Sequence, residues 1–189
     1  MAKTSSRAAI LPRGFYLDSP DLVAQKLLGK LLVRGRMAGR IVEVEAYFGE
    51  SDPSSHSYPG KTARNAVLFG PPGHAYVYFI YGMYYCLNVS CEPEGRAGGV
   101  LFRALEPIRG LELSTSGPGR LCKAFGITRD RDNGVDLTSP RSDLQIRDDG
   151  YVADDILITP RIGITKDTAR PARFLLAGNP YVSGKRSSS

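Results

Sequence analysis

The chain contains 189 residues, of which 42% are hydrophobic and 23% charged, and it carries a formal net charge of +6. This length and balance predict one globular domain over residues 1–189, with residues 1–9 and 184–189 as flexible ends. The excess of Lys and Arg suits a polyanionic partner, but many basic proteins bind no nucleic acid, so charge alone does not identify the function.

Cysteine and histidine residues are too few and too scattered to predict a metal site. Cys86, Cys91 and Cys122 show no zinc-knuckle spacing, and only His56 and His74 could join them. We expect reduced thiols, no metal and no cofactor, in a cytoplasmic (bacterial-type, nucleoid-associated) or nuclear protein. No segment approaches membrane-spanning length and no apolar stretch follows the basic start, so neither membrane insertion nor secretion is expected. A short organelle-targeting role for that start stays open.

The secondary-structure signals, taken in chain order, predict strands and two short helices. Ser19, Pro20 and Asp21 mark the start of a helix that ends before Gly29. A second helix is expected over Pro118–Phe125, with Ser116 as its cap and Gly126 at its end. Strands are expected at Lys30–Val33, Arg40–Phe48, Ala75–Ile80, Tyr84–Ser90, Gly99–Leu105 and Ile156–Ile164.

These elements lack the regular β-α-β alternation of a doubly wound sheet. We therefore predict an α+β single domain: a mixed, mostly antiparallel β-sheet with flanking short helices and a protruding β-hairpin.

The strand expected at residues 40–48 carries two acidic side chains. Side chains alternate across a strand, which places Glu43 and Glu45 on one face with Ile41 and Tyr47, opposite an apolar face. Carboxylates two residues apart lie about 6.5–7 Å from each other at the backbone, so like-charge repulsion could make one of them a general base. The alternative is an edge or solvated strand face with one carboxylate in a salt bridge.

The segment from Tyr76 to Tyr85 holds five of the ten tyrosines. Its aromatic and β-branched residues favour two strands, and Gly82 permits a tight turn at residues 81–84. Aromatic side chains and Met are unfavourable to leave in water at a hairpin tip. The tip therefore packs into the core or an oligomer contact, or it acts as an apolar wedge between DNA base pairs.

Two polar residues interrupt the later strands. Arg103 stands on a strand that is otherwise apolar on both faces, and a buried guanidinium needs an anion. That anion is either a protein carboxylate or a phosphate or substrate group. Asn88 is the lone amide of its strand, and it either bonds a neighbouring loop or serves a site.

Six segments of the chain combine into one longer pattern. They are, in order, Arg40–Tyr47, His56-Ser57, Arg64-Asn65, Tyr76–Asn88, Leu101–Pro107 and Gly117–Cys122. Together they resemble the alkyladenine (3-methyladenine) DNA glycosylase family. The likeness extends over nearly the whole chain, and it is highly specific because the motifs are long.

The resemblance implies a monofunctional, monomeric DNA glycosylase of base excision repair. Such an enzyme flips a damaged, alkylated or deaminated purine nucleotide out of double-stranded DNA and hydrolyses its N-glycosidic bond, leaving an abasic site. Glu45 matches the general base that activates water. Arg103 and the main-chain carbonyl of Ile162 match groups that hold this water, and Arg103 also matches a contact to the flipped nucleotide's phosphate.

The resemblance also implies a base pocket and a DNA-binding surface. Tyr47, His56 and Tyr78 match the residues that sandwich the flipped base. Asn88 matches an amide that disfavours the 2-amino group of normal guanine. Tyr81 matches the residue that intercalates into the gap left by the base. The remaining DNA-binding residues implied are Met83, Tyr84, Lys61 and Thr62.

One departure from the family pattern and two other classes of function stay open. Residues 108–116 form a shorter segment than the family often carries, which leaves DNA affinity and footprint open. The preferred lesions also stay open, because family members differ in them and the matched site residues do not separate them. A non-catalytic module that binds tRNA or DNA would use Glu45 and Arg103 only as a structural ion pair. A glycoside hydrolase would use Glu43 and Glu45, although side chains two apart on a strand point the same way instead of flanking a bond.

Overall fold

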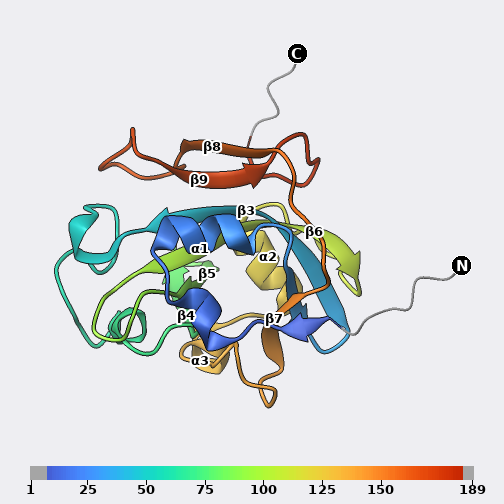
Figure 1. The fold of residues 1–189 in the computed structure, drawn as a ribbon, viewed down its shortest axis with the longest axis horizontal. Coiled ribbons are helices and arrows are strands. Elements are labelled where there is room, and N and C mark those ends of the chain that lie inside the picture. Colours follow the sequence, from blue (N-terminus) through green and yellow to red (C-terminus); the bar gives the residue numbers. More distant parts are fainter. Residues whose placement is uncertain (1–7, 185–189) are drawn as a thin grey trace, which may run out of the picture.

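The computed structural model describes residues 8–184, and its centre is a nine-stranded sheet (Figure 1). The strands are β1 Ala9–Ile10, β2 Leu31–Arg34, β3 Met37–Tyr47, β4 Ala75–Ile80, β5 Tyr84–Ser90, β6 Gly99–Arg109, β7 Leu144–Asp148, β8 Ile156–Pro160 and β9 Pro171–Leu176. Their order is β1-β7-β2-β3-β6-β5-β4, with β9 paired to β3 and β8 paired to β9. Every pairing is antiparallel, so the predicted α+β class is confirmed.

Residues 1–7 and 185–189, which make up most of the two ends predicted to be flexible, lie outside the described residues. Ala9 and Ile10 pair with β7. Within residues 8–184 no helix has the length and apolar character needed to cross a membrane.

Short helices accompany the sheet. They are α1 Pro20–Leu27, α2 Pro118–Phe125 and α3 Arg129–Asp132. Gly126 ends α2 in the left-handed conformation with φ 61°, as predicted. The predicted cap of α2 is wrong: Gly117 is the N-cap, and the Ser116 hydroxyl donates instead to the carbonyl of Val182 at 3.4 Å.

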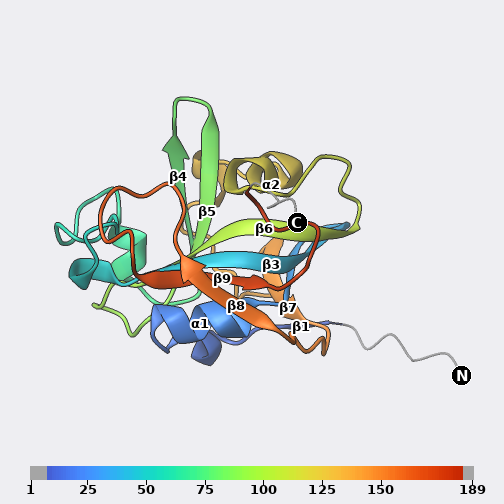
Figure 2. The same cartoon turned by 90° about the horizontal axis from the view of Figure 1, so that it is seen from above.

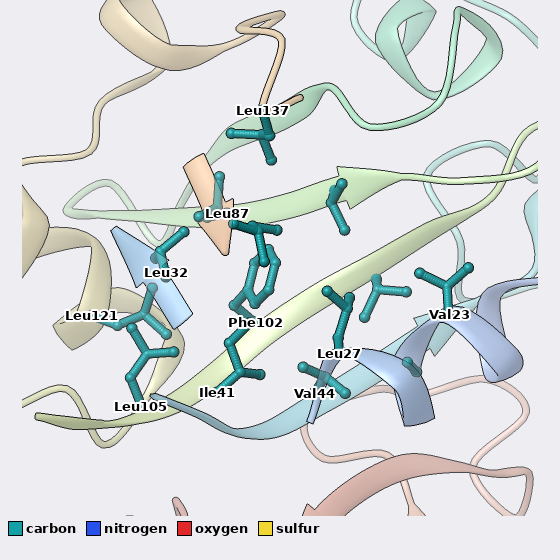
Figure 3. Close-up of a cluster of buried hydrophobic side chains, with 14 of the residues drawn as sticks. Val23, Leu27, Leu32, Ile41, Val44, Leu87, Phe102, Leu105, Leu121 and Leu137 are labelled. Carbon is teal, nitrogen blue, oxygen red and sulfur yellow. The ribbon is translucent and has the colours of Figure 1, made fainter. Parts of the chain in front are cut away.

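The core lies between the sheet and the helices. Figure 3 shows Leu27 of α1 next to Val44 of β3, Val23 further along the same helix, and Leu121 of α2 near Leu105 of β6. All five side chains are completely buried. Each contributes about 1.5–3 kcal/mol relative to an exposed side chain, so this cluster fixes the helices against β3 and β6.

Strand β3 is bonded along both edges where its acidic residues lie. Glu45 stands opposite Leu101 of β6 on one side and Arg173 of β9 on the other. The interpretation of this strand as an edge or solvated face is therefore wrong. The register with β6 shifts on both sides of Glu43, and Ile41 packs in the core with Val44 (Figure 3), so the strict alternation predicted for residues 41–47 is interrupted.

The predicted hairpin is present and projects from the body of the molecule (Figure 2). Its strands β4 and β5 pair from Ala75–Val89 to Ile80–Tyr84, but β5 pairs with β6 only at residues 88–90. At the tip Tyr81 and Gly82 have φ of 53° and 66°, the positive values that a type I′ turn requires at both central positions. The turn closes with a hydrogen bond from the Met83 N–H to the Ile80 carbonyl, 3.3 Å.

The strand predicted at Ile156–Ile164 ends early. Strand β8 stops at Pro160, which has no N–H to donate, and Gly163 then adopts φ 75°. Residues 162–166 consequently form a loop that borders the cavity described below.

Candidate active site

The hairpin, β3, β6, the start of α2 and several loops border an open cavity of about 770 Å³, a size typical of ligand sites. The cavity brings together most of the residues singled out from the sequence: Glu45, Tyr47, His56, Tyr78, Tyr81, Tyr84, Asn88, Arg103 and Ile162. Three others lie outside it. Met83 is exposed at the hairpin tip, Lys61 is exposed on a loop, and Thr62 borders a smaller cavity behind His56.

Glu45 lies in the wall of the cavity and has no solvent-exposed surface. Its Oε1 accepts a hydrogen bond from the Ile162 N–H at 2.8 Å and lies 3.3 Å from Nη1 of Arg103. Its Oε2 accepts from the Tyr47 hydroxyl at 2.9 Å. Three donors on three different elements therefore fix one carboxylate at the edge of the cavity.

Glu43 is also completely buried, but unlike Glu45 it is not among the described residues that line the cavity. Its Oε1 accepts from Nε of Arg103 at 3.0 Å, from Nε of Arg173 at 2.7 Å and from the Ser183 hydroxyl at 2.9 Å. Its Oε2 accepts from the Ser183 N–H at 2.5 Å. Arg103 thus bridges both carboxylates, and the anion predicted for it is a protein carboxylate in this structure.

Aromatic rings line the cavity next to Glu45. The rings of His56 and Tyr78 lie 4.4 Å apart between centroids at 65°, and Nδ1 of His56 lies 3.0 Å from the Tyr76 hydroxyl. Part of the His56 ring is exposed to the cavity, but burial of the remainder and the charge of Arg64 lower its pKa, so this ring is neutral at neutral pH.

Tyr47 and Tyr78 keep their hydroxyl protons over the whole neutral range. Burial raises the pKa of Tyr47 far above its ordinary value, and the carboxylate of Glu45 raises it further. Burial likewise raises the pKa of Tyr78, with Cys86 as the next cause. Tyr47 can therefore serve Glu45 only as a hydrogen-bond donor.

Asn88 sits at the base of the hairpin, where its side chain is almost completely buried. Its Nδ2 donates to the main-chain carbonyl of Tyr76 at 3.2 Å, so the amide has a fixed orientation. Asn88 also lines the cavity. The structural hydrogen bond expected for Asn88 is therefore present, although it goes to strand β4 and not to a loop, and its role in a site stays a prediction.

The hairpin tip is exposed, not packed into the core of the chain. Tyr81 is 77% exposed and Met83 66% exposed. A positive φ at a tyrosine is unusual and costs free energy, and such strain occurs preferentially at functional positions. This part of the chain is available to contact another molecule beside the cavity.

Several residues around the cavity escaped the sequence analysis. The N–H of Ile162 contacts Glu45, whereas only its carbonyl was considered. Asp52 and Arg161 form a buried ion pair next to Tyr47. Arg161 stood inside a predicted strand, but the position of Pro160 just before it was a usable signal that the strand ends there.

The arrangement combines a buried carboxylate, hydrogen-bond donors and flat aromatic walls in one cavity. It suits a hydrolytic reaction on a substrate with a planar ring, in which the carboxylate accepts a proton from water. Residues 8–184 contain no group of three or more His, Cys, Asp and Glu side chains placed to hold a metal ion. The three cysteines are buried and unpaired.

Comparison with known proteins gives consistent matches over almost the whole chain. A family model described as methylpurine-DNA glycosylase matches residues 14–180. A protein of Koribacter versatilis named as a 3-methyladenine DNA glycosylase is 58% identical, covering 96% of each chain. Proteins with the same name from Burkholderia lata and Methanocella arvoryzae are 49% and 48% identical, covering 93% and 92% of this chain and 92% and 96% of their own.

Proposed function

This chain belongs to the methylpurine-DNA glycosylase family, and we propose that it flips damaged purine nucleotides out of duplex DNA into the cavity beside Glu45. Its activity is that of the family: hydrolysis of the N-glycosidic bond of alkylated purines in DNA repair. Its partner is therefore DNA. The proposal further includes a monomer that uses no metal, acts in the compartment that holds the DNA, and accepts deaminated as well as alkylated purines.

Base flipping is supported by the position of Glu45. A base within the helical stack cannot reach a buried carboxylate, so the nucleotide must leave the duplex, which costs a few kcal/mol and least at damaged pairs. Tyr81 offsets this cost, because an exposed aromatic ring beside the cavity can stack in the gap. Met83, Tyr84, Lys61 and Thr62 complete the DNA-binding surface in this proposal.

The flipped purine is held between aromatic side chains. In this proposal Tyr47 stacks on one side of the purine and the adjacent rings of His56 and Tyr78 stack on the other; all three residues line the cavity. Stacking of this kind is worth about 1–3 kcal/mol per base and accepts any purine. Selectivity then comes from Asn88, whose amide is fixed by its bond to Tyr76 and, in this proposal, collides with the 2-amino group of guanine.

Glu45 is the general base in this mechanism. It takes a proton from a water molecule that Arg103 and the Ile162 carbonyl hold, and the water adds to the sugar carbon as the purine departs. The sugar becomes oxocarbenium-like as the bond breaks, and the same carboxylate stabilises that positive charge. The observation that carries the assignment is the full burial of Glu45 in the cavity wall with three donors on its oxygens.

The charge of the departing base determines whether it must be protonated before it leaves. A 3- or 7-alkylated purine already carries a positive charge and leaves as a neutral molecule. Neutral hypoxanthine leaves more readily after protonation, and His56 is a poor source of that proton because its pKa is lowered. We therefore expect faster excision of the charged lesions.

Abasic-site formation tests the proposal. Duplexes that contain either hypoxanthine or 7-methylguanine are incubated with the protein and then treated with hot alkali. We expect strand breaks at the lesion only after alkali, because the proposed site contains no amine nucleophile. An undamaged duplex of the same sequence is the control. Absence of breaks at both lesions would overturn the proposed function, and a covalent adduct trapped with borohydride would overturn the hydrolytic mechanism.

A further inference from the structure

A buried ion pair behind the cavity has no part in the mechanism above. The side chains of Asp52 and Arg161 are fully buried and paired at two points, with Nη1 2.5 Å from Oδ2 and Nη2 3.0 Å from Oδ1. Desolvation of both charges largely cancels the attraction in such a pair, so it gives the fold little that apolar side chains would not give. Its location suggests another role.

Arg161 lies against the ring of Tyr47. Its Cζ is 4.6 Å from the ring centroid, within the range of a cation–π contact. Tyr47 lines the cavity, whereas Arg161 is not among the described residues that do so. The guanidinium therefore covers the ring face that is turned away from the cavity, and the opposite face remains for the purine.

The pair holds this guanidinium in place. Arg161 also donates to the main-chain carbonyl of Ala46 at 3.0 Å, directly before Tyr47 in the chain. Asp52 accepts two backbone N–H groups of its own loop, at 3.1 and 3.0 Å. Neither side chain can move without breaking several buried contacts, so the positive charge has one position relative to the ring.

The charges of Arg161 and Arg170 are balanced by those of Asp52 and Asp167, but the charged group that stacks on the Tyr47 ring, the guanidinium of Arg161, is positive. Asp167 lies 3.7 Å from Nη2 of Arg161 and is itself paired with Arg170 at 2.6 Å. An aromatic ring that already attracts a cation on one face attracts a second cation on its other face less strongly, and the two cations repel. A neutral purine stacks on Tyr47 without this penalty.

We propose that Arg161, held by Asp52, is a positioning residue that sets the selectivity of the pocket between cationic and neutral purines. The guanidinium behind Tyr47 restrains binding of cationic lesions, which are chemically the easier substrates, and so lets neutral lesions compete for the pocket. This inference rests on the proposed function.

Single-turnover excision of 7-methylguanine, which is cationic, and of hypoxanthine, which is neutral, tests it. The measured quantity is the ratio of the two rate constants for the wild type, Asp52→Asn, Arg161→Lys and the double variant Asp52→Asn/Arg161→Met. Asparagine keeps the shape of Asp52, and the double variant removes both charges together. Circular dichroism and the thermal midpoint establish that each variant is folded.

We expect the ratio to rise at least about threefold in the double variant, which loses the cation behind the ring. The ratio should fall in Asp52→Asn, which leaves that cation without its partner, and it should stay near the wild-type value in Arg161→Lys. A merely structural pair would slow both lesions alike, so an unchanged ratio in Asp52→Asn and the double variant overturns the inference. If the double variant does not fold, the ratio measured for Asp52→Asn decides alone: a lower ratio than in the wild type supports the inference, and an unchanged ratio overturns it. Failure of the wild type to excise either lesion would instead refute the proposed function.

Discussion

Replacement of Glu45 by Gln separates catalysis from binding. The amide oxygen of glutamine can accept the hydrogen bonds from Ile162 and Arg103, and its NH₂ group can donate to the Tyr47 hydroxyl, which then acts as the acceptor. In this arrangement the Tyr47 O–H loses its carboxylate acceptor, so we expect a loss of stability of about 1–3 kcal/mol. The variant lacks the proton acceptor, and its excision rate should fall by about 10²–10⁴, equivalent to about 2.7–5.4 kcal/mol.

The assay measures excision with protein in excess over a duplex that contains hypoxanthine, followed by alkali and separation of the strands. Binding to an abasic-analogue duplex is measured in parallel and should stay within about threefold of the wild type, less than a 1 kcal/mol change. Wild-type excision by Glu45→Gln would refute the assignment of the general base.

Glu43→Gln is the matched control, because its effect should be on stability. Four donors surround Glu43, on both of its oxygens, so the NH₂ group of a glutamine must face either the Ser183 N–H or the two arginines. Disruption of a buried ion pair costs about 3–5 kcal/mol, which appears as a lower unfolding free energy. The folded fraction should excise faster than Glu45→Gln does. Equal rates for the two folded variants would contradict the separate roles given to the two carboxylates.

Three further predictions concern selectivity, the hairpin tip and pH. Asn88→Ser should widen the pocket and give measurable excision of guanine, alone or in a mismatch, with less change toward hypoxanthine; unchanged discrimination in single-turnover assays would place the filter elsewhere. Tyr81→Ala should weaken binding to an abasic-analogue duplex by about 1–3 kcal/mol more than binding to undamaged duplex, whereas Tyr81→Phe should not. The salt dependence of binding should not change in Tyr81→Ala, since Tyr81 neutralises no phosphate, and equal loss on both duplexes would contradict the wedge. The pKa of His56 is lowered from 6.5 in the folded protein, so the unfolded chain binds more protons below that pH and stability falls as the pH drops from about 6.5 through the lowered pKa. His56→Gln should lose less stability than the wild type when the pH is lowered from 7.5 to 5. An equal drop of the thermal unfolding midpoint in the two proteins over this pH range would disprove this.

The elements that could be predicted from the sequence carry strong local signals. The hairpin was recognisable because aromatic and β-branched residues flank Gly82, and the end of α2 because Gly126 follows its last turn. Strands β7 and β9 were missed because they lack such signals and are stabilised by their neighbours β2 and β3. Tertiary pairing, not local propensity, decides these strands.

The candidate site was predictable only in part. Glu45 stood out as one of two acidic residues on one face of a strand and Arg103 as a charge on an otherwise apolar strand, and the family resemblance gave them roles. The contacts of Glu43 with Arg173 and Ser183, and the pair of Asp52 with Arg161, join residues more than one hundred positions apart in the chain. Such contacts follow from the fold, and no spacing in the sequence encodes them.

The most direct test of the proposed mechanism is a crystal structure of Glu45→Gln bound to a duplex that contains hypoxanthine. We predict that the hypoxanthine ring lies in the cavity between Tyr47 and the rings of His56 and Tyr78. The Gln side chain at position 45 should lie next to the sugar carbon that carries the base, and Tyr81 should fill the gap in the duplex. A base that remains stacked in the duplex, or a flipped base held away from position 45, would contradict the account.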